Sequence, residues 1–377
     1  MNVNSPQAIR LALVITDLRM GGAEKTLTQL AVRLAERGFL PEVYSLGPKP
    51  DRRDALVKVL SESRIPVHYL GCTRWWQFCS AVNRLARLFR EQRPQSVQAF
   101  LFHANVVGAL AARRAKIPAV FLGLRVAEPV AWRWYVQRWL ASQVQQFVCV
   151  SEAVASYARS VGGLPAHKLT VIPNGIDLET VDARSPADLR DLGIPSGRQV
   201  IVCVSRMDRQ KGIDWLLGHA PALLQRLPGH ELILLGEGPY FQAAQQKVKS
   251  SGFSDRVHLL GWRDDVLEIM KAAQLFVLPS RWEGMSNALL EAMSCQLPVV
   301  AMDVEGVREV VGPGSAEQVA PPGNADEFLA RVVSLAESPR QARCLGQGNR
   351  RHVAENFSLQ RVSDAYAGLY GTPDPQQ

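Results

Sequence analysis

The chain has 377 residues, enough for two ordinary domains, and its 47% hydrophobic and 21% charged residues are typical of a globular protein. Its six cysteines are scattered without a CxxC pair, which disfavours a zinc site or a disulfide framework and favours a reducing compartment. The net charge of +8 is uneven, because residues 1–175 hold 23 Lys and Arg against 10 Asp and Glu, whereas residues 176–377 hold 20 against 25. A basic first half indicates either an anionic partner or a solvated basic surface.

The first half alternates short β-rich runs with helical patterns. The run IRLALVIT (9–16) predicts a strand, and residues 21–38 predict a helix because their leucines and alanines recur at helical spacing. The longest apolar stretch, residues 99–112, is too short to span a membrane. With no secretory signal pattern at the N-terminus, we expect a soluble protein of the cytoplasm. Further strands are predicted at residues 42–46, 96–102, 118–124, 146–151 and 169–175.

The same alternation restarts in the second half. Helices are predicted from Gly212 and from near Ser286, each directly after a strand. Strands that alternate with helices form parallel sheets covered on both faces, and the restart indicates two such sheets. We therefore predict an α/β fold with two Rossmann-like, doubly wound parallel-sheet domains that face a cleft. The strands of the second half are predicted at residues 199–205, 230–236, 257–261, 275–280 and 298–302.

A domain boundary is predicted within residues 173–199, which are rich in Pro, Gly and Asp. Ligands of open α/β sheets bind at the carboxyl ends of the strands, where loops enter helices. The loops that follow the predicted strands are therefore the expected location of a functional site.

A glycine pair follows the first predicted strand. Gly21 and Gly22 open a helix with free backbone N–H groups, which suit an anion or a closely packed sugar, although a packing turn would look the same. The sequence contains no GxGxxG and no GxxxxGK[ST] pattern. Both a dinucleotide site of the usual kind and a P-loop ATPase are therefore disfavoured.

Two cations follow the first strand of the second half. Arg206 leaves the strand end, and Lys211 lies just before the helix that starts near Gly212. Two positive side chains beside a helix N-terminus can hold a diphosphate without a metal ion. A solvated loop with two surface cations is the alternative.

Two glutamates surround the start of a later helix. Glu283 lies in a glycine turn and Glu291 lies early in the helix, so their carboxylates suit hydroxyl groups at opposite ends of an extended ligand. A capping glutamate plus a surface glutamate is the alternative, but it explains Glu291 poorly because apolar residues flank it. Backbone N–H groups of the helix start could meet a charged middle part of the ligand.

The stretch EGMSNALLEAMSCQLPVVA (283–301) resembles the signature of the retaining glycosyltransferases of family 4, which have the GT-B fold. The resemblance implies transfer of a hexose from a nucleotide-diphosphate sugar, with no metal and no cofactor, in the synthesis of bacterial cell-surface polysaccharide. It implies an acceptor-binding domain at 1–175 joined by a returning helix at 356–377, and a nucleotide-sugar-binding domain at 176–355. Supporting motifs occur in the expected order over nearly the whole chain: GGAEK, VSEAVA, VIPNGID, VSRMDRQKG, LLGEGP, VHLLGWRDDV and LFVLPSRWEGMSNALLEAM.

The resemblance also implies roles for single residues. Arg206 and Lys211 are similar to the diphosphate ligands of the family, Glu283 to the residue near the donor-sugar hydroxyls, and Glu291 to the ribose ligand. The full donor-binding set that it implies is Gly21, Gly22, Gly284, Met285, Ser286, Asn287 and Glu291.

The sequence departs from the family at one position. Many members carry a histidine after the strand at 118–124, where this chain has Arg125. His103 lies one strand earlier. Either Arg125 or His103 could contact the donor sugar in place of the usual histidine, and the sequence leaves this open.

The expected reaction is hexose transfer, with a UDP-sugar as donor and a glycan or lipid-linked saccharide as acceptor. The mechanism that the resemblance implies is attack from the leaving-group face, with a phosphate oxygen accepting the proton of the acceptor. One alternative is a nucleotide-sugar epimerase of the same fold. A second alternative is a non-catalytic binder of sugar or nucleic acid through the basic half, although a nucleic-acid partner is not what we expect.

Aromatic and basic residues alternate in two segments of the first half, 73–93 and 131–144. In the first segment, one helical face is expected in the core, and it consists of Phe78, Ala81, Val82, Leu85, Leu88 and Phe89. In the second segment, Trp132, Tyr135, Val136 and Trp139 share a face that is also expected in the core, whereas Trp134 points away from it. Exposed tryptophans among arginines suit the surface of an anionic membrane, so we expect the first domain to bind one peripherally. The tryptophans predicted to make this contact are Trp75, Trp76 and Trp134.

Overall fold

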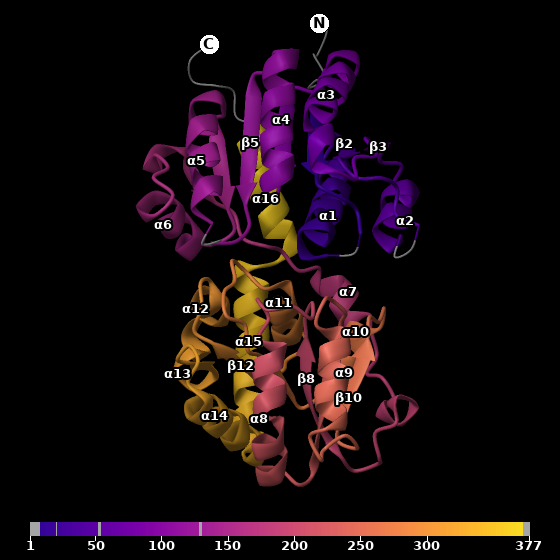
Figure 1. Cartoon of the computed structure of the whole chain (residues 1–377), viewed down its shortest axis with the longest axis vertical. Coiled ribbons are helices and arrows are strands. Elements are labelled where there is room, and N and C mark those ends of the chain that lie inside the picture. Colours follow the sequence, from indigo (N-terminus) through magenta and orange to yellow (C-terminus); the bar gives the residue numbers. More distant parts are fainter. Residues whose placement is uncertain (1–7, 20, 52–53, 128–129, 372–377) are drawn as a thin grey trace, which may run out of the picture. The chain divides into compact units, whose positions relative to one another are not determined.

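The computed structural model describes residues 8–19, 21–51, 54–127 and 130–371 of the chain. It divides into two compact units (Figure 1). The first unit comprises Met1–Gly175 together with Leu359–Gln377, and the second comprises Ile176–Ser358. The chain therefore passes between the units at two places, after Gly175 and after Ser358.

The first unit is built on a seven-stranded sheet in the order β3-β2-β1-β4-β5-β6-β7, in which all the neighbouring pairs are parallel. Its central strands are almost entirely apolar because helices cover both faces of the sheet. The strands are β1 (Arg10–Ile15), β2 (Leu40–Ser45), β3 (Val67–Tyr69), β4 (Ser96–Phe100), β5 (Ala119–Leu124), β6 (Gln146–Cys149) and β7 (Leu169–Val171).

Two groups of helices pack on this sheet. The helix α1 contacts α2 and the C-terminal α16, whereas α4 contacts both α3 and α5. The helices are α1 (Gly22–Glu36), α2 (Ala55–Glu62), α3 (Phe78–Gln92), α4 (Phe102–Ala115), α5 (Ala131–Leu140), α6 (Glu152–Ser160) and α16 (Leu359–Gly371). Short 3₁₀ turns lie at η1 (Trp75–Gln77), η2 (Ala141–Gln143) and η3 (Ala166–Lys168).

The C-terminal α16 is part of the core of the first unit. Val362, Tyr366 and Tyr370 are buried in one cluster with apolar residues of β1 and α1. The Tyr370 hydroxyl donates a hydrogen bond of 3.2 Å to the Gln98 side chain on β4. This helix is therefore needed to close the first unit, although the sequence places it after the whole second unit.

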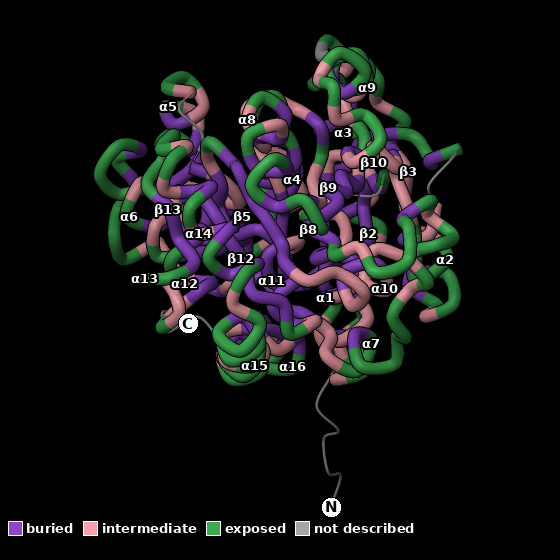
Figure 2. The backbone as a smooth tube through the Cα atoms, turned by 90° about the horizontal axis from the view of Figure 1, so that it is seen from below, coloured by how far each residue is buried: buried purple, intermediate pink, exposed green. Residues whose placement is uncertain are grey.

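The second unit holds a six-stranded parallel sheet in the order β10-β9-β8-β11-β12-β13. Figure 2 shows the strands mostly buried and the outer turns of the helices exposed. The strands are β8 (Gln199–Val204), β9 (His230–Leu235), β10 (Val257–Gly261), β11 (Leu275–Leu278), β12 (Val299–Met302) and β13 (Val319–Ala320).

Helices follow nearly every strand of the second unit. They are α7 (Leu178–Asp182), α8 (Ile213–Arg226), α9 (Phe241–Lys249), α10 (Val266–Ala272), α11 (Asn287–Ser294), α12 (Val307–Val311), α13 (Ser315–Gln318), α14 (Ala325–Glu337) and α15 (Pro339–Asn356), with 3₁₀ turns at η4 (Leu189–Leu192) and η5 (Gly312–Gly314). Within the part of the chain that the structure describes, no helix is both long and apolar enough to cross a bilayer.

The prediction of two parallel-sheet α/β domains is confirmed. Two short strands, β3 and β13, were not predicted, because runs of three and two residues carry little periodicity.

The burial of the two faces of α5 is the reverse of the prediction. Trp134 is buried and its ring centroid lies 5.6 Å from that of Tyr157. A Cβ atom on Gly162 would lie 2.5 Å from the Trp134 ring, so glycine at this position leaves room for the indole. The prediction that Trp134 is exposed is therefore wrong. Three residues expected in the core are exposed instead: Trp132, Tyr135 and Trp139.

The other aromatic segment agrees with the prediction in part. Ala81, Val82, Leu85 and Phe89 of α3 are buried as expected, but Phe78 is exposed. Trp76 is exposed too. The Trp75 side chain lies outside what the structure describes.

Candidate active site

In the second unit, hydrogen bonds join the loop that follows β8 to the loop that follows β11. These two strands are neighbours in the parallel sheet, so their carboxyl ends lie side by side. The Arg281 N–H donates 2.7 Å to the Gln210 carbonyl, and the Gln210 side chain donates 2.9 Å to the Trp282 carbonyl. The two loops therefore form one connected surface.

Glycine is required where the first loop enters α8. Gly212 has φ of 65°, and a Cβ there would lie 2.0 Å from the Pro279 carbonyl oxygen. Both the left-handed conformation and the close approach exclude a larger residue. This contact sets how near Lys211, one residue earlier, lies to the loop after β11.

An ion pair at the protein surface also joins these two loops. The Arg281 guanidinium donates two hydrogen bonds of 2.8 Å to the Asp214 carboxylate and one of 2.7 Å to the Arg209 carbonyl. The hydrogen bonds from Arg281 lower the pKa of Asp214. Bidentate arginine–carboxylate geometry adds directional restraint, so Arg281 and Asp214 hold the loop that carries Lys211.

Lys211 and Glu283 are in direct contact. The Lys211 Nζ lies 2.5 Å from the Glu283 Oε1, and the Ser280 hydroxyl donates 2.7 Å to the same oxygen. Both charged groups are largely buried, with side-chain exposures of 17% and 5%. A buried cation and carboxylate held together can exchange partners with a ligand that brings both negative charge and hydroxyl groups.

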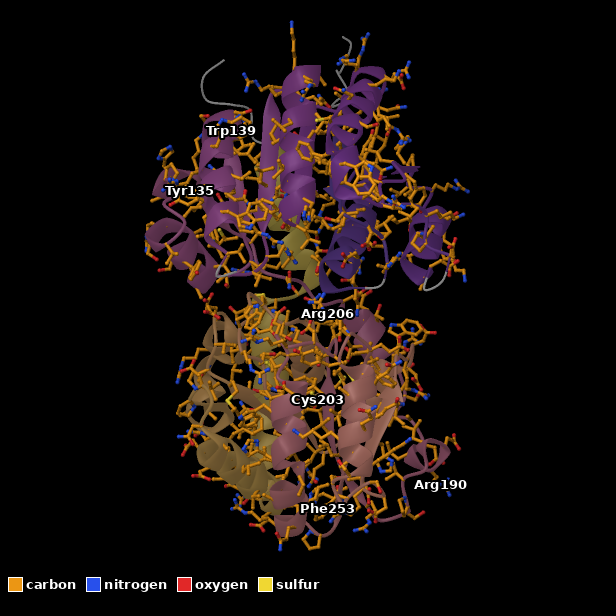
Figure 3. All side chains as sticks on the ribbon, in the orientation of Figure 1. Tyr135, Trp139, Arg190, Cys203, Arg206 and Phe253 are labelled. Atoms are coloured by element: carbon orange, nitrogen blue, oxygen red, sulfur yellow. The ribbon has the colours of Figure 1, made fainter. Side chains whose placement is uncertain are left out.

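Arg206 lies at the end of β8 with its side chain 66% exposed (Figure 3). Its Nε donates 2.5 Å to the Asp208 carboxylate, whose other oxygen accepts 3.2 Å from the Lys211 N–H. Asp208 therefore connects the two predicted diphosphate ligands. The structure places Arg206 and Lys211 in one loop but does not bring their charged groups onto a common partner.

The start of α11 is as predicted. The Ser286 hydroxyl accepts 3.3 Å from the Leu289 N–H and caps the helix, which begins at Asn287. Gly284 and Met285, which precede the cap, are buried. Glu291 is 8% exposed, one turn into the helix. It is therefore not a surface glutamate.

The predicted site residues of the first unit lie at the carboxyl ends of neighbouring strands. Gly21 is the N-cap of α1 after β1, His103 lies in the first turn of α4 after β4, and Arg125 follows β5 directly. Because β1, β4 and β5 are adjacent, these residues lie at neighbouring strand ends. His103 is exposed there, and its ring lies 5.5 Å from that of Phe102.

Arg125 is engaged within the first unit. Its guanidinium donates hydrogen bonds to the Asn174 side chain and to the Tyr366 hydroxyl, and it lies 5.5 Å from the Phe100 ring. Burial lowers the pKa of Arg125. Among the described residues, its Nη1 has no hydrogen-bond partner. Arg125 thus connects β5 to α16, which makes it a positioning residue more than a free ligand.

Several residues that shape the site were not predicted from sequence. They are Asp208, Asp214, Ser280, Arg281, Asn174 and Tyr366. The only signal in the sequence was their position within the same strand-end loops, or, for Tyr366, on the predicted returning helix.

Comparison with known families accounts for both units. Residues 20–180 match the model described as Glycosyltransferase Family 4, and residues 198–338 match the model described as Glycosyl transferases group 1. The chain belongs to glycosyltransferase family 4. Its fold is GT-B.

Characterised relatives of this glycosyltransferase differ in donor and acceptor. A UDP-Gal:alpha-D-GlcNAc-diphosphoundecaprenol alpha-1,3-galactosyltransferase of Escherichia coli is 24% identical over 76% of this chain and 77% of its own length. A lipopolysaccharide core biosynthesis mannosyltransferase, LpsB of Rhizobium meliloti strain 1021, is 32% identical over 53% of this chain and 60% of its own. The chain thus spans more than three quarters of the first relative and three fifths of the second.

Solved structures match over almost the full length. The Anabaena protein Alr3699/HepE in complex with UDP-glucose superposes with a TM-score of 0.85 at 23% identity, over 96% of this chain and 99% of that protein. This likeness shows the fold.

Proposed function

We propose that this glycosyltransferase moves a hexose from a nucleotide-diphosphate sugar, with retention at the anomeric carbon and without a metal ion. The observation that carries the proposal is the buried Lys211–Glu283 contact of 2.5 Å beside the capped start of α11. A cation, a carboxylate and a helix N-terminus together match the parts of such a donor: a diphosphate and a hydroxylated sugar.

Different residues of the second unit contact different parts of the donor. Lys211 and Arg206 hold the diphosphate, and the N–H groups from Gly284 to Asn287 support the phosphate or the sugar. Glu283 accepts hydrogen bonds from the sugar hydroxyls, and Glu291 accepts them from the ribose. Donor binding then replaces the Lys211–Glu283 pair with contacts to the diphosphate on one side and to the sugar on the other.

In the transfer step, the acceptor hydroxyl oxygen bonds to the anomeric carbon on the face that the diphosphate leaves. The bond from that carbon to the phosphate oxygen breaks, and its electron pair goes to the leaving diphosphate. A phosphate oxygen takes the hydroxyl proton, so no protein base is required. The residues around the diphosphate contribute by stabilising its developing charge in a fixed arrangement.

A UDP-sugar is the proposed donor, and a glycan or lipid-linked saccharide is the proposed acceptor. UDP-Gal and a GlcNAc-diphosphoundecaprenol appear in the name of the E. coli relative, and Alr3699/HepE was solved with UDP-glucose. A relative from Mycolicibacterium smegmatis is named as GDP-mannose-dependent, so GDP-sugars belong in any test. We place the reaction in cell-surface polysaccharide synthesis, at the cytoplasmic face of the membrane.

The residues at the strand ends of the first unit complete the proposal. Gly21 and Gly22 are proposed to take part in donor binding, and His103, which is exposed at its strand end, is proposed to take the role of the usual family histidine. Arg125 is proposed to hold the carboxyl ends of these strands in place through its hydrogen bonds to Asn174 and Tyr366.

A thermal-shift screen with UDP-, GDP- and ADP-sugars tests the proposal. A ligand at about 100 times its dissociation constant should stabilise the protein by roughly 2.7 kcal/mol. Incubation of the stabilising donor without acceptor should leave its sugar configuration unchanged, whereas an epimerised sugar would identify an isomerase instead. A chain that no nucleotide sugar stabilises, but that binds nucleic acid in a salt-dependent way, would overturn the proposal.

A further inference from the structure

The outer face of α5 exposes three large aromatic rings. Trp132, Tyr135 and Trp139 are 56%, 64% and 53% exposed, whereas Trp134 on the opposite face is 7% exposed. Their spacing of three and four residues places all three on one side of the helix. Tyr135 and Trp139 both lie on α5 (Figure 3). Exposed aromatic rings in a row, on a helix whose other face is already buried, indicate a surface that contacts a partner.

Cations lie beside two of these rings, and the third lines a pocket with two more cations. The Arg138 guanidinium lies 4.8 Å from the centre of the Tyr135 ring, and that of Arg133 lies 5.7 Å from the Trp132 ring. Trp139 lines a surface pocket of about 640 Å³ together with Arg113 and Lys116. The aromatic face is therefore accompanied by positive charge along its whole length.

The positive surface continues beyond α5. A second pocket of about 430 Å³ shares Lys116 with the first and is lined by Arg90 and Arg93. In the part of the chain that the structure describes, Arg90, Arg93, Arg113 and Lys116 form no ion pair with a carboxylate. Residues 130–151, which include α5, contain neither Asp nor Glu.

Cations at the ends of α3 and α4 also stabilise the helix dipoles, and this effect alone would explain Arg90 and Arg113. It does not explain why tryptophan and tyrosine are exposed on the neighbouring helix. Most protein partners would bring both charge signs, whereas this face offers only positive charge and amphipathic rings. Indole and phenol rings favour the headgroup level of a bilayer, and Lys and Arg favour anionic lipid.

We propose that the outer face of α5, with the cations of the two pockets, docks on an anionic lipid bilayer. The ten-residue helix would lie along the surface with Trp132, Tyr135 and Trp139 at headgroup level, and Arg113 and Lys116 would meet lipid phosphates. The contact is short, so binding should be reversible and dependent on salt. Because Trp134 is buried, the proposed surface on α5 differs from the one predicted from Trp75, Trp76 and Trp134.

The inference deepens the proposed function, because a lipid-linked acceptor would require the enzyme to work at a membrane. The test needs neither donor nor acceptor, so its failure is distinguishable from failure of the transferase proposal. The intact chain is cosedimented with phosphatidylcholine vesicles with and without phosphatidylglycerol. Binding should require phosphatidylglycerol at about 50 mM salt and be largely lost at about 500 mM.

Two variants locate the surface. Replacement of Trp132, Tyr135 and Trp139 by Ala, or of Arg113 and Lys116 by Glu, should lower partitioning by roughly tenfold or more. The fluorescence of wild-type tryptophans should shift to shorter wavelength with anionic vesicles, and the aromatic variant should lose this shift. Thermal melts establish that each variant is folded.

Matched controls come from the same chain. Arg226→Glu with Lys249→Glu removes two cations from the last turns of α8 and α9, and Trp76→Ala with Phe78→Ala removes exposed rings elsewhere in the first unit. Both should bind within about twofold of wild type. Absence of binding to anionic vesicles at low salt, or equal binding by the α5 variants, would overturn the inference. Self-association that only the α5 variants lose, without vesicle binding, would instead identify the face as a contact between copies.

Discussion

Lys211 has a carboxylate partner within the second unit. Its ammonium group is held by Glu283, which itself accepts a hydrogen bond from Ser280. A diphosphate must therefore compete with a buried ion pair, and it succeeds only if it brings more negative charge and if the sugar satisfies Glu283. This exchange would favour the intact donor over inorganic phosphate.

Replacement of either predicted diphosphate ligand by alanine should reduce turnover. Loss of one donor that stabilises developing charge typically costs roughly 100- to 1,000-fold in rate. Arg206→Ala should change the melting temperature little, because its side chain is 66% exposed. Release of nucleoside diphosphate measures the rate.

Arg226→Ala, an exposed cation at the end of α8, is the control for this experiment. EDTA should leave the wild-type rate largely intact, and a loss that Mg²⁺ restores would contradict a metal-free site. Near-normal turnover in both the Lys211 and the Arg206 variants would show that the diphosphate lies elsewhere.

Replacement of the two glutamates should affect nucleotide binding and sugar transfer differently. Glu291→Gln should weaken binding of the free nucleoside diphosphate, because the ribose contact is present with or without sugar. Glu283→Gln should bind it as well as wild type or more tightly, because it releases Lys211 from its partner, while transfer falls. Calorimetric titration and a turnover assay measure these quantities. Equal loss of diphosphate affinity in both variants would refute the division of roles.

At the scale of elements, the site depends on how the loops after β8 and β11 are joined. The Arg281–Asp214 pair, the hydrogen bonds of Gln210 and the close contact at Gly212 all join the same two loops. These contacts are absent from any local pattern in the sequence, because they join residues about 70 positions apart, far beyond the reach of periodicity. Only the neighbouring positions of β8 and β11 in the sheet bring them together.

The Asp214–Arg281 pair predicts a pH dependence of stability. The pKa of Asp214 is lower in the folded protein than its ordinary value, chiefly because Arg281 donates hydrogen bonds to the carboxylate. The unfolded chain therefore binds the proton more readily, so the contribution of the pair is complete above about pH 4 and is lost as the pH falls below it. Asp214→Asn should melt lower than wild type at neutral pH, and the difference should shrink in acid. A constant difference across this range would contradict the prediction.

The helix α16 gives a second prediction at this scale. Tyr366→Ala removes a side chain that is 1% exposed and that accepts a hydrogen bond from Arg125. By analogy with other large-to-small core changes, the free energy of unfolding of the first unit should fall by about 3–5 kcal/mol. Urea denaturation measures it, with the exposed Gln360→Ala as control. A loss no larger than that of the control would mean that α16 is dispensable to the first unit.

The sequence could predict the sheets because their strands are continuous apolar runs, and it could predict the start of α11 because Ser286 is a typical N-cap. It could not predict the faces of α5. Both faces of that helix carry aromatic rings, so periodicity alone does not say which one is buried. The deciding feature is the space beside Gly162, which is distant in sequence and is filled by Trp134. Nor could the sequence show that Lys211 and Glu283 touch, because 72 residues separate them.

At the scale of the whole molecule, charge is divided between the two units in the way their proposed partners require. The first unit, residues 1–175 with 359–377, carries a net charge of +12, and the second, residues 176–358, a net charge of −4. The basic unit holds the surface proposed to meet anionic lipid. We propose that the acidic unit binds an anionic donor through the buried Lys211 rather than through its overall field, so donor affinity should depend on Lys211 far more than on salt.

Titration calorimetry of the intact chain with UDP, GDP and ADP, and with the matching nucleosides, tests the central claim most directly. At least one diphosphate should bind saturably, and Lys211→Ala should weaken that binding by about thirtyfold or more, as expected when a buried charge pair is truncated. Binding of the nucleoside, which lacks the diphosphate, should not change in the variant. If none of the three diphosphates binds, or if wild type and Lys211→Ala bind the diphosphate equally, the second unit does not hold a nucleotide sugar in the way described.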